Sequence, residues 1–212
     1  MKSAPANLEF RSVSAGYDDS DPVLHGISAH IGPGLTLIGG PNGSGKSTLI
    51  EVAAGNLPLM SGECLVLGRS ARCDDVRRLR TYCPHDNGLI PGLSLYEHLH
   101  LAGLFAAQYR PAVDRRIDEW GLKKWLHTQV SDLSTGNQRK AWLLVCLADT
   151  QQVVLLDEPF NGLDPESAQS LMETLKELRD SGRTLVLVSH APPESVHSLV
   201  TSHIYVQDGQ LV

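Results

Sequence analysis

Residues 40–47 read Gly40-Pro41-Asn42-Gly43-Ser44-Gly45-Lys46-Ser47, which matches the pattern G-x-x-x-x-G-K-[ST]. The apolar stretch Leu35–Ile38 before them predicts a buried strand, and residues 45–54 predict a helix after them. Glycines let the backbone curl so that successive N–H groups point inward at an anion. The following helix presents its free N–H groups and positive dipole end to the same point. Strand, loop and helix together predict a phosphate-binding site.

The polar side chains of this loop have expected roles in holding a nucleotide. Lys46 can reach the β- and γ-phosphates, and the Ser47 hydroxyl can bind Mg²⁺. We therefore expect a nucleoside triphosphate and Mg²⁺ as the cofactors. A glycine-rich turn that carries a lysine by chance would not have this flanking strand and helix. The nucleotide-binding residues predicted here are Pro41, Asn42, Gly43, Ser44, Gly45, Lys46, Ser47 and Thr48.

A second acidic motif lies roughly 110 residues further on, in Val153-Val154-Leu155-Leu156-Asp157-Glu158. Four consecutive apolar residues predict a fully buried central strand. Acidic residues at its carboxyl end lie where α/β sheets bind ligands. Asp157 is then placed to hold Mg²⁺ through water, and Glu158 is the candidate base for the attacking water. A strand followed by a solvated turn is the alternative, which the phosphate loop upstream disfavours.

Composition excludes some classes of function. The 212 residues are 42% hydrophobic and 20% charged, which is typical of an ordinary globular domain. The net charge of -6 argues against a nucleic-acid partner, because nucleic-acid binders usually carry a basic face. The densest basic patch, Arg77, Arg78 and Arg80, is predicted to be a solvated helix face.

The expected location is the cytoplasm. The N-terminal residues do not resemble a signal peptide, and no apolar run approaches the roughly 18 residues that cross a bilayer. The four cysteines form no C-x-x-C pair, so we expect reduced thiols. Any membrane role would therefore require a partner, with this chain peripheral on the cytoplasmic face.

Strand and helix signals alternate on both sides of a helical middle segment. Strands are expected at residues 8–13, 23–31, 34–39, 63–67, 152–156, 183–188 and 203–206, with a hairpin turn at Asp208-Gly209. Helices are expected at 45–54, 94–107, 111–120, 134–148, 165–180 and 192–199. This order predicts one α/β domain over residues 1–212, a P-loop NTPase core whose mixed sheet has an antiparallel β edge. The core is expected at about 1–82 and 149–212, with an inserted helical subdomain at about 83–148.

Further motifs carry a family resemblance that extends over about residues 8–211. Leu133-Ser134-Thr135-Gly136-Asn137-Gln138 resembles the L-S-G-G-Q signature of ABC ATPases and stands about 20 residues before the acidic strand. Phe160-Asn161-Gly162-Leu163-Asp164 is similar to the D-loop of that family, and Ser189-His190 to its switch histidine. Tyr17 lies upstream of the phosphate loop, where the family stacks an aromatic ring on adenine.

The resemblance implies that the chain works as one half of a dimer. Two nucleotide-binding domains of this family close head to tail, and each ATP is shared between them. Ser134 and Gly136, with Asn137 beside them, would cap the γ-phosphate held by the other subunit, at the start of a helix whose dipole favours the anion. His190 would contact the γ-phosphate, and Asp164 would cross the interface. Hydrolysis would then open the dimer.

The sequence departs from the family in the segment Tyr82-Cys83-Pro84-His85, which resembles the Q-loop but ends in histidine instead of glutamine. That glutamine contacts Mg²⁺ or the attacking water and links the site to the helical subdomain. A neutral imidazole offers one donor and one acceptor, so we expect His85 to keep these contacts and to make activity pH-dependent. Thr135 and Asn137 are further departures, in the signature. We still expect an active ATPase, with the catalytic residues Lys46, Glu158 and His190.

The leading functional interpretation is the ATP-hydrolysing subunit of an ABC transporter, docked on a separate integral-membrane subunit. The chain ends soon after its last expected strand, which favours an exporter-type subunit. The alternative is a soluble ABC ATPase that acts on a cytosolic protein or nucleic-acid complex. A P-loop kinase or GTPase-like switch is disfavoured, because neither a lid nor a base-reading motif is found. Several apolar residues of the helical subdomain either line a groove for the membrane subunit or fill the subdomain's own core. They are Leu93, Leu95, Leu99, Leu101, Leu104 and Phe105.

Overall fold

The computed structural model describes residues 7–18, 20–105, 110–148 and 151–212, in which the strands form two sheets. The larger sheet has the strand order β10-β9-β3-β8-β7-β6, and the smaller sheet the order β2-β1-β4-β5. Pairs in the larger sheet are parallel except β10–β9, and pairs in the smaller sheet are antiparallel. The expected α/β fold with a mixed sheet is confirmed. The strands are β1 (Leu8–Ala15), β2 (Leu24–Ile31), β3 (Gly34–Gly39), β4 (Ser61–Val66), β5 (Arg69–Ser70), β6 (Arg80–Cys83), β7 (Val153–Asp157), β8 (Thr184–Val188), β9 (Ser202–Gln207) and β10 (Gln210–Leu211).

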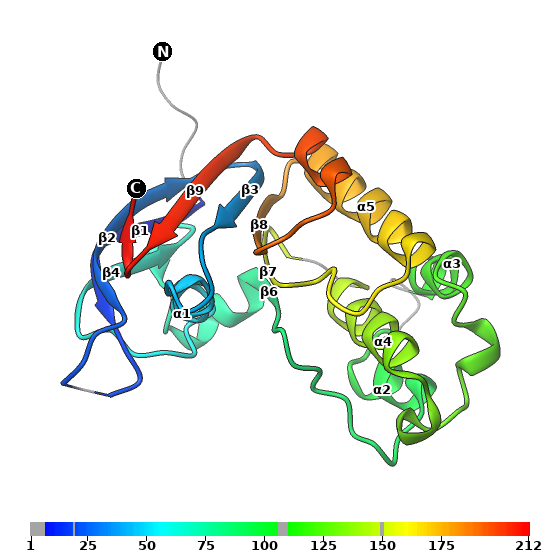
Figure 1. The fold of residues 1–212 in the computed structure, drawn as a ribbon. Helices are drawn as coiled ribbons and strands as arrows, with labels where there is room; N and C mark the ends of the chain where they lie inside the picture. Colours follow the sequence, from blue (N-terminus) through cyan, green and yellow to red (C-terminus); the bar gives the residue numbers. More distant parts are fainter. Residues whose placement is uncertain (1–6, 19, 106–109, 149–150) are drawn as a thin grey trace.

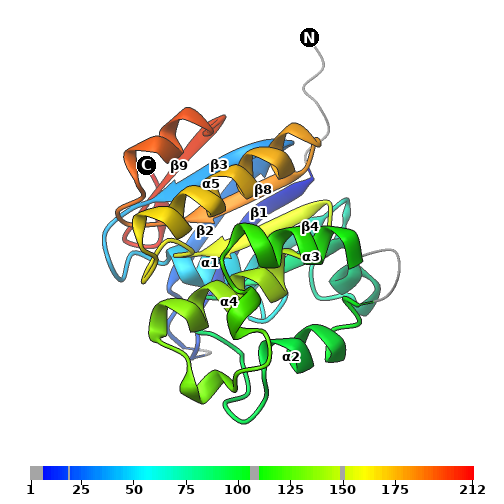
Figure 2. The same ribbon diagram turned by 90° about the vertical axis from the view of Figure 1, so that its right-hand side faces the viewer.

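Some helices pack on the faces of the sheets, and others lie beyond the edge of the larger sheet (Figure 1). Helix α1 (Lys46–Ala53) packs between the two sheets, and α5 (Pro165–Asp180) covers the other face of the larger sheet. Helices α2 (Leu95–Leu101), α3 (Arg110–Glu119) and α4 (Thr135–Leu147) lie beyond β6 in Figure 1, and Figure 2 shows them beside one another. None of the helices in the described residues combines the length and apolarity that crossing a bilayer requires.

The central strand β7 is buried on both faces. Val153 and Leu155 pack in the core that contains α1 and the smaller sheet. Val154 and Leu156 point the other way and pack with α5 and the helices beyond β6. Alternate residues of a strand face opposite sides of the sheet, so burial of both sides explains the uninterrupted apolar run. The same arrangement fixes the end of β7, where the acidic residues lie.

Two of the expected helices differ from the structure. The helix expected at 192–199 is wrong, because Glu194–Ser198 form only a 3-10 helix. The hydrogen bonds of this segment span three residues, from the N–H of Val196 to the carbonyl of Pro193 and from the N–H of Leu199 to the carbonyl of Val196. The helix expected at 94–107 ends at Leu101, and Gly103 follows with φ 70°. Residues 106 and 107 lie outside the described residues. Other 3-10 helices are Asp74–Leu79, Lys123–Trp125 and Val130–Asp132.

Arg80 contradicts the expectation of a solvated helix face. Arg77 and Arg78 are exposed, but Arg80 is the first residue of the unexpected strand β6 and is buried. Its Nη1 donates to the carbonyl of Ala71 at 2.7 Å, and its Nη2 donates to the carbonyl of Ala54 at the end of α1. Arg80 therefore ties the edge strand of the larger sheet to the helix that follows the phosphate loop.

We expect Arg80→Ala to lower the free energy of unfolding by about 1–3 kcal/mol, because two buried carbonyls lose their donor. Urea denaturation followed by circular dichroism measures this change. The matched control is Arg77→Ala, which removes an exposed guanidinium from the same segment. Equal losses in the two variants would contradict the structural role of Arg80.

Candidate functional site

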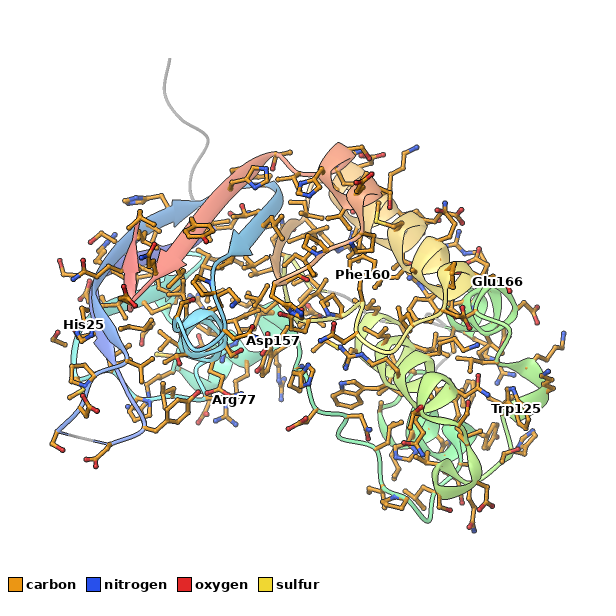
Figure 3. All side chains as sticks on the ribbon, in the orientation of Figure 1. His25, Arg77, Trp125, Asp157, Phe160 and Glu166 are labelled. Atoms are coloured by element: carbon orange, nitrogen blue, oxygen red, sulfur yellow. The ribbon has the colours of Figure 1, made fainter. Side chains whose placement is uncertain are left out.

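A cavity of about 620 Å³ lies at the carboxyl edge of the larger sheet, where parallel strands end and α/β proteins bind ligands. It gathers predicted residues from five separate segments of the chain. In Figure 3, Asp157 lies close to α1 near the middle of the molecule. The lining residues are Tyr17, Val23, Asn42, Gly43, Gly45, Lys46, Ser47, Thr48, Glu51, His85, Asp157, Glu158, Asn161 and His190.

The phosphate loop has the backbone that an anion site requires. Gly40 has φ 144°, and a Cβ there would lie 2.1 Å from the carbonyl oxygen of Val206. Gly45 has φ 102° and precedes α1 without any side chain that caps the helix. The first N–H groups of an uncapped helix have no partner within the helix, so they are available to an anion. Ser44 is buried within the loop, and its hydroxyl has no hydrogen-bond partner among the described residues.

Lys46 is held over the loop by backbone carbonyls. Its Nζ donates to the carbonyl of Gly40 at 2.9 Å and to that of Pro41 at 2.8 Å. The side chain is buried, and no carboxylate in the described part of the chain forms an ion pair with it. Carbonyl dipoles do not neutralise a full charge, so the ammonium keeps a positive field at the loop. This field attracts a phosphate.

Ser47 and Asp157 meet from opposite motifs. The Ser47 Oγ lies 3.4 Å from the Asp157 Oδ1, and the aspartate is buried. Burial raises the pKa of the Asp157 carboxyl, the hydrogen bond from Ser47 lowers it, and the nearby Glu158 charge raises it. Proteins usually bind Mg²⁺ through one or two such oxygens plus substrate phosphates and waters. The hydroxyl and carboxylate therefore fit Mg²⁺, whose charge would favour the ionised aspartate.

Glu158 is fixed between the ends of β7 and β8. Its φ is 47°, which is uncommon for a residue with a side chain, and its N–H donates to the carbonyl of Val188 at 2.9 Å. The Oε1 accepts from the backbone N–H of His190 at 2.9 Å and pairs with its Nδ1 at 2.8 Å. The Oε2 accepts from Ser189 Oγ at 3.0 Å. Glu158 and His190 therefore form one hydrogen-bonded unit at the cavity.

Tyr17 lies at the mouth of the same cavity. The residue is 66% exposed, and its hydroxyl donates to Glu51 Oε2 at 2.9 Å. Burial of the hydroxyl end and this carboxylate raise the pKa of Tyr17, although a contact with Thr48 lowers it. An exposed ring whose hydroxyl is anchored offers a face on which a base can stack.

Four predicted residues lie away from this cavity. Ser134 caps α4 by accepting from the N–H of Asn137 at 3.3 Å, as the sequence indicates. Asp164 caps α5 by accepting from the N–H of Ser167 at 2.8 Å, which lowers the pKa of the aspartate. Asn137 and Asp164 line a second cavity of about 290 Å³. These residues and Gly136 do not line the 620 Å³ cavity.

Sequence reasoning missed Ser189, Glu51 and Asn161. Ser189 stands directly before His190, and its hydroxyl donates to the Glu158 carboxylate. Glu51 lies one turn beyond the phosphate loop, on the face of α1 that points at Tyr17. Asn161 sits in the segment after Glu158 and lines the cavity. The polar residue directly after strand β8 was the available signal for Ser189.

Comparison with known proteins gives consistent matches over most of the chain. The family model described as "ABC transporter" matches residues 24–161. The Manganese transport system ATP-binding protein MntA of Synechocystis is 30% identical, over 87% of this chain and 75% of the relative. The Cytochrome c biogenesis ATP-binding export protein CcmA of Chelativorans is 32% identical, over 91% of this chain and 93% of the relative. Other curated relatives are longer, and the chain spans 7% to 34% of them.

A solved structure has the same fold. The dimeric structure of MJ0796, "a Bacterial ABC Transporter Cassette", superposes with a TM-score of 0.83 at 23% identity, over 96% of each chain. The family match covers more than half of this chain, and CcmA is matched along nearly its whole length. The chain therefore belongs to the ABC transporter family, among its ATP-binding cassette proteins.

Proposed function

We propose that this chain is the ATP-hydrolysing subunit of an ABC transporter, with ATP and Mg²⁺ bound in the 620 Å³ cavity. The observation that carries this proposal is the convergence of Lys46, the Ser47–Asp157 pair and the Glu158–His190 unit on that cavity. The proposed unit is a single domain over residues 1–212. Its core is at about 1–82 and 149–212, and its helical subdomain at about 83–148.

In the proposed reaction, the loop N–H groups and Lys46 bind the β- and γ-phosphates, and Tyr17 stacks on the adenine. Ser47 and Asp157 would hold Mg²⁺, with His85 at the same wall of the cavity. The ion, when bound, neutralises charge on the phosphate oxygens. Glu158 accepts a proton from the attacking water while His190 holds the carboxylate in place and contacts the γ-phosphate.

The proposed working state is a head-to-tail dimer. Ser134, Gly136 and Asn137 sit at the N-terminus of α4 but outside the cavity of their own chain, so we assign them to the nucleotide of a second ABC ATPase subunit. Asp164 would cross the interface. Among the described residues outside its own helix, a Cβ at Gly136 would meet the Gly162 carbonyl at 3.5 Å, and the adjacent Ser134 and Thr135 are exposed and accessible to a partner. MJ0796, which has the same fold, has a dimeric structure, and this supports the pairing of two subunits.

The proposed membrane partner docks on the helices beyond β6, with this chain peripheral on the cytoplasmic face. Leu95, Leu99 and Leu104 are buried in the subdomain's own core, whereas Leu101 on α2 is 69% exposed and available to a partner. The relatives include a transport-system subunit and an export protein. We favour an exporter-type role, since the export protein CcmA is 32% identical to this chain over 93% of the relative.

We expect Glu158→Gln to lower kcat for ATP by about 10²–10⁴-fold while ATP binding is retained. Glutamine keeps the shape and can accept from His190 and donate to Ser189, so the loss isolates the missing base. Phosphate release and binding of a fluorescent ATP analogue are measured on the same preparations. If the Glu158→Gln variant hydrolyses ATP at the wild-type rate, Glu158 is not the base.

Mixing two inactive variants tests the shared site. Lys46→Met removes the phosphate-binding ammonium, and Gly136→Asp places a carboxylate where the signature would meet the partner's γ-phosphate. In a head-to-tail homodimer, mixed dimers retain one intact site, so equal mixing should give about a quarter of wild-type ATPase activity. Each variant alone is the control. A mixture that stays inactive would contradict a dimer of identical chains.

Affinity purification from detergent-solubilised membranes tests the transporter assignment. We expect a stoichiometric integral-membrane protein to co-purify with the tagged chain, and Leu101→Asp to weaken its recovery. An exposed site on α3, Asp114→Ser, serves as the control. Recovery of the chain with a cytosolic partner instead would favour a soluble ABC ATPase.

A further inference from the structure

We propose that Arg139 is a positioning residue for ATP hydrolysis, which transmits the position of helix α4 to Glu158 and His85. The inference rests on the proposed function, because it assigns a role in that same reaction. Arg139 lies on α4, about one turn after the signature residues that begin the helix. It does not line the nucleotide cavity and touches neither predicted base nor predicted metal ligand through their side chains.

The Arg139 guanidinium donates to backbone carbonyls on two different segments. Its Nη1 donates to the carbonyl of His85 at 2.8 Å, with that of Pro84 at 3.5 Å. Its Nη2 donates to the carbonyl of Glu158 at 2.8 Å, with that of Asp157 at 3.4 Å. These segments follow the neighbouring parallel strands β6 and β7, so one planar group bridges two strand ends.

The burial of this cation shows how much it depends on those contacts. The residue is 8% exposed, and no carboxylate among the described residues forms an ion pair with it. A buried charge is costly unless polar groups solvate it, and here the solvation comes from the carbonyls. The rigid fork of arginine can serve both segments at once, whereas the single ammonium of lysine cannot.

The contact between Arg139 and the Glu158 carbonyl bears on the reaction through the position of the Glu158 carboxylate. Its left-handed backbone is held on one side by β8, through its N–H and its carboxylate. On the other side its carbonyl is held by Arg139. A displacement of Arg139 would therefore rotate the peptide that follows Glu158 and shift the carboxylate against the water it activates. Misplacement by about 1 Å can slow a reaction by about 10²-fold.

Helix α4 contacts the segment around His85 through a second residue. Trp142 lies nearly one turn after Arg139, and its Nε1 donates to the carbonyl of Pro84 at 3.4 Å. Its ring also packs on Gly88, where a Cβ would lie 2.9 Å from the ring. Any shift of α4 must therefore carry residues 84–88 with it. When Ser134 and Gly136 engage the partner's nucleotide, this connection would align the hydrolytic residues of their own chain.

Chemical rescue separates positioning from stability. A cavity of about 300 Å³ is lined by Arg139, His85 and Asn161, so a free guanidinium ion has a route to the vacated position. We expect Arg139→Ala to lower kcat by about tenfold to a hundredfold, with KM for ATP within about twofold of wild type. Guanidinium chloride at non-denaturing concentration should restore part of kcat, whereas equal sodium chloride should not.

The matched control is Arg115→Ala. Arg115 also joins two elements, through paired contacts to Glu177 on α5 at 3.0 and 2.9 Å, but it lines neither the nucleotide cavity nor its neighbour. We expect kcat of the Arg115→Ala variant to stay within about twofold of wild type and not to respond to guanidinium. If Arg139→Ala does not fold, Arg139→Lys takes its place and should show the same loss of kcat, because it keeps the charge without the fork.

Three results would overturn the inference: an Arg139 variant with wild-type kcat, a parallel loss of ATP binding and kcat, or a loss in Arg139→Ala that guanidinium does not reverse. The wild-type chain and Glu158→Gln are assayed alongside. If the wild-type chain binds ATP but its turnover does not depend on Glu158, the proposed function fails instead. The two failures are thus distinguished within one set of assays.

Discussion

The parallel alignment of β3, β6, β7 and β8 is the constraint on which the site depends. Parallel strands end at one edge, so the phosphate loop after β3, the acidic pair at the end of β7 and Ser189-His190 after β8 meet there. Burial of both sheet faces holds these strands in place, because their apolar side chains fill a hydrophobic core on each side of the sheet. The positions of the reacting groups therefore follow from the hydrophobic core.

Charge at this edge is balanced by dipoles as much as by opposite charges. Lys46 and Arg139 are both buried, and backbone carbonyls solvate both cations. Asp157 is buried near Glu158, so its pKa is raised and its ionised form gains from a bound cation. A site that contains the N-terminus of a helix without a side-chain cap, together with a solvated ammonium, is prepared for a polyphosphate. The Asp157 carboxylate beside Ser47 would bind the Mg²⁺ ion that accompanies the polyphosphate.

Several side chains serve the fold and the proposed chemistry together. Ser134 caps α4 and Asp164 caps α5, yet both lie on a surface that the proposed dimer would bury. A capping role alone explains their contacts within one chain. The proposed dimer adds a reason for their position, because both residues stand at helix N-termini outside the lining of the cavity. The same helix α4 also reaches inward through Arg139 and Trp142, which links the outer surface to the segments after β6 and β7.

The phosphate loop, the acidic strand, the hairpin turn at Asp208-Gly209 and the starts of α4 and α5 could be predicted from the sequence. Each depends on residues close together in the chain, where backbone conformation and periodicity leave a local signature. Strand β6 and the burial of Arg80 could not be predicted, since a four-residue strand is stabilised by its pairing with β7, about 70 residues away. The roles of Ser189 and Arg139 depend on atoms 19 to 54 residues distant. Local pattern determined which groups the chain carries, and long-range packing determined which of them meet.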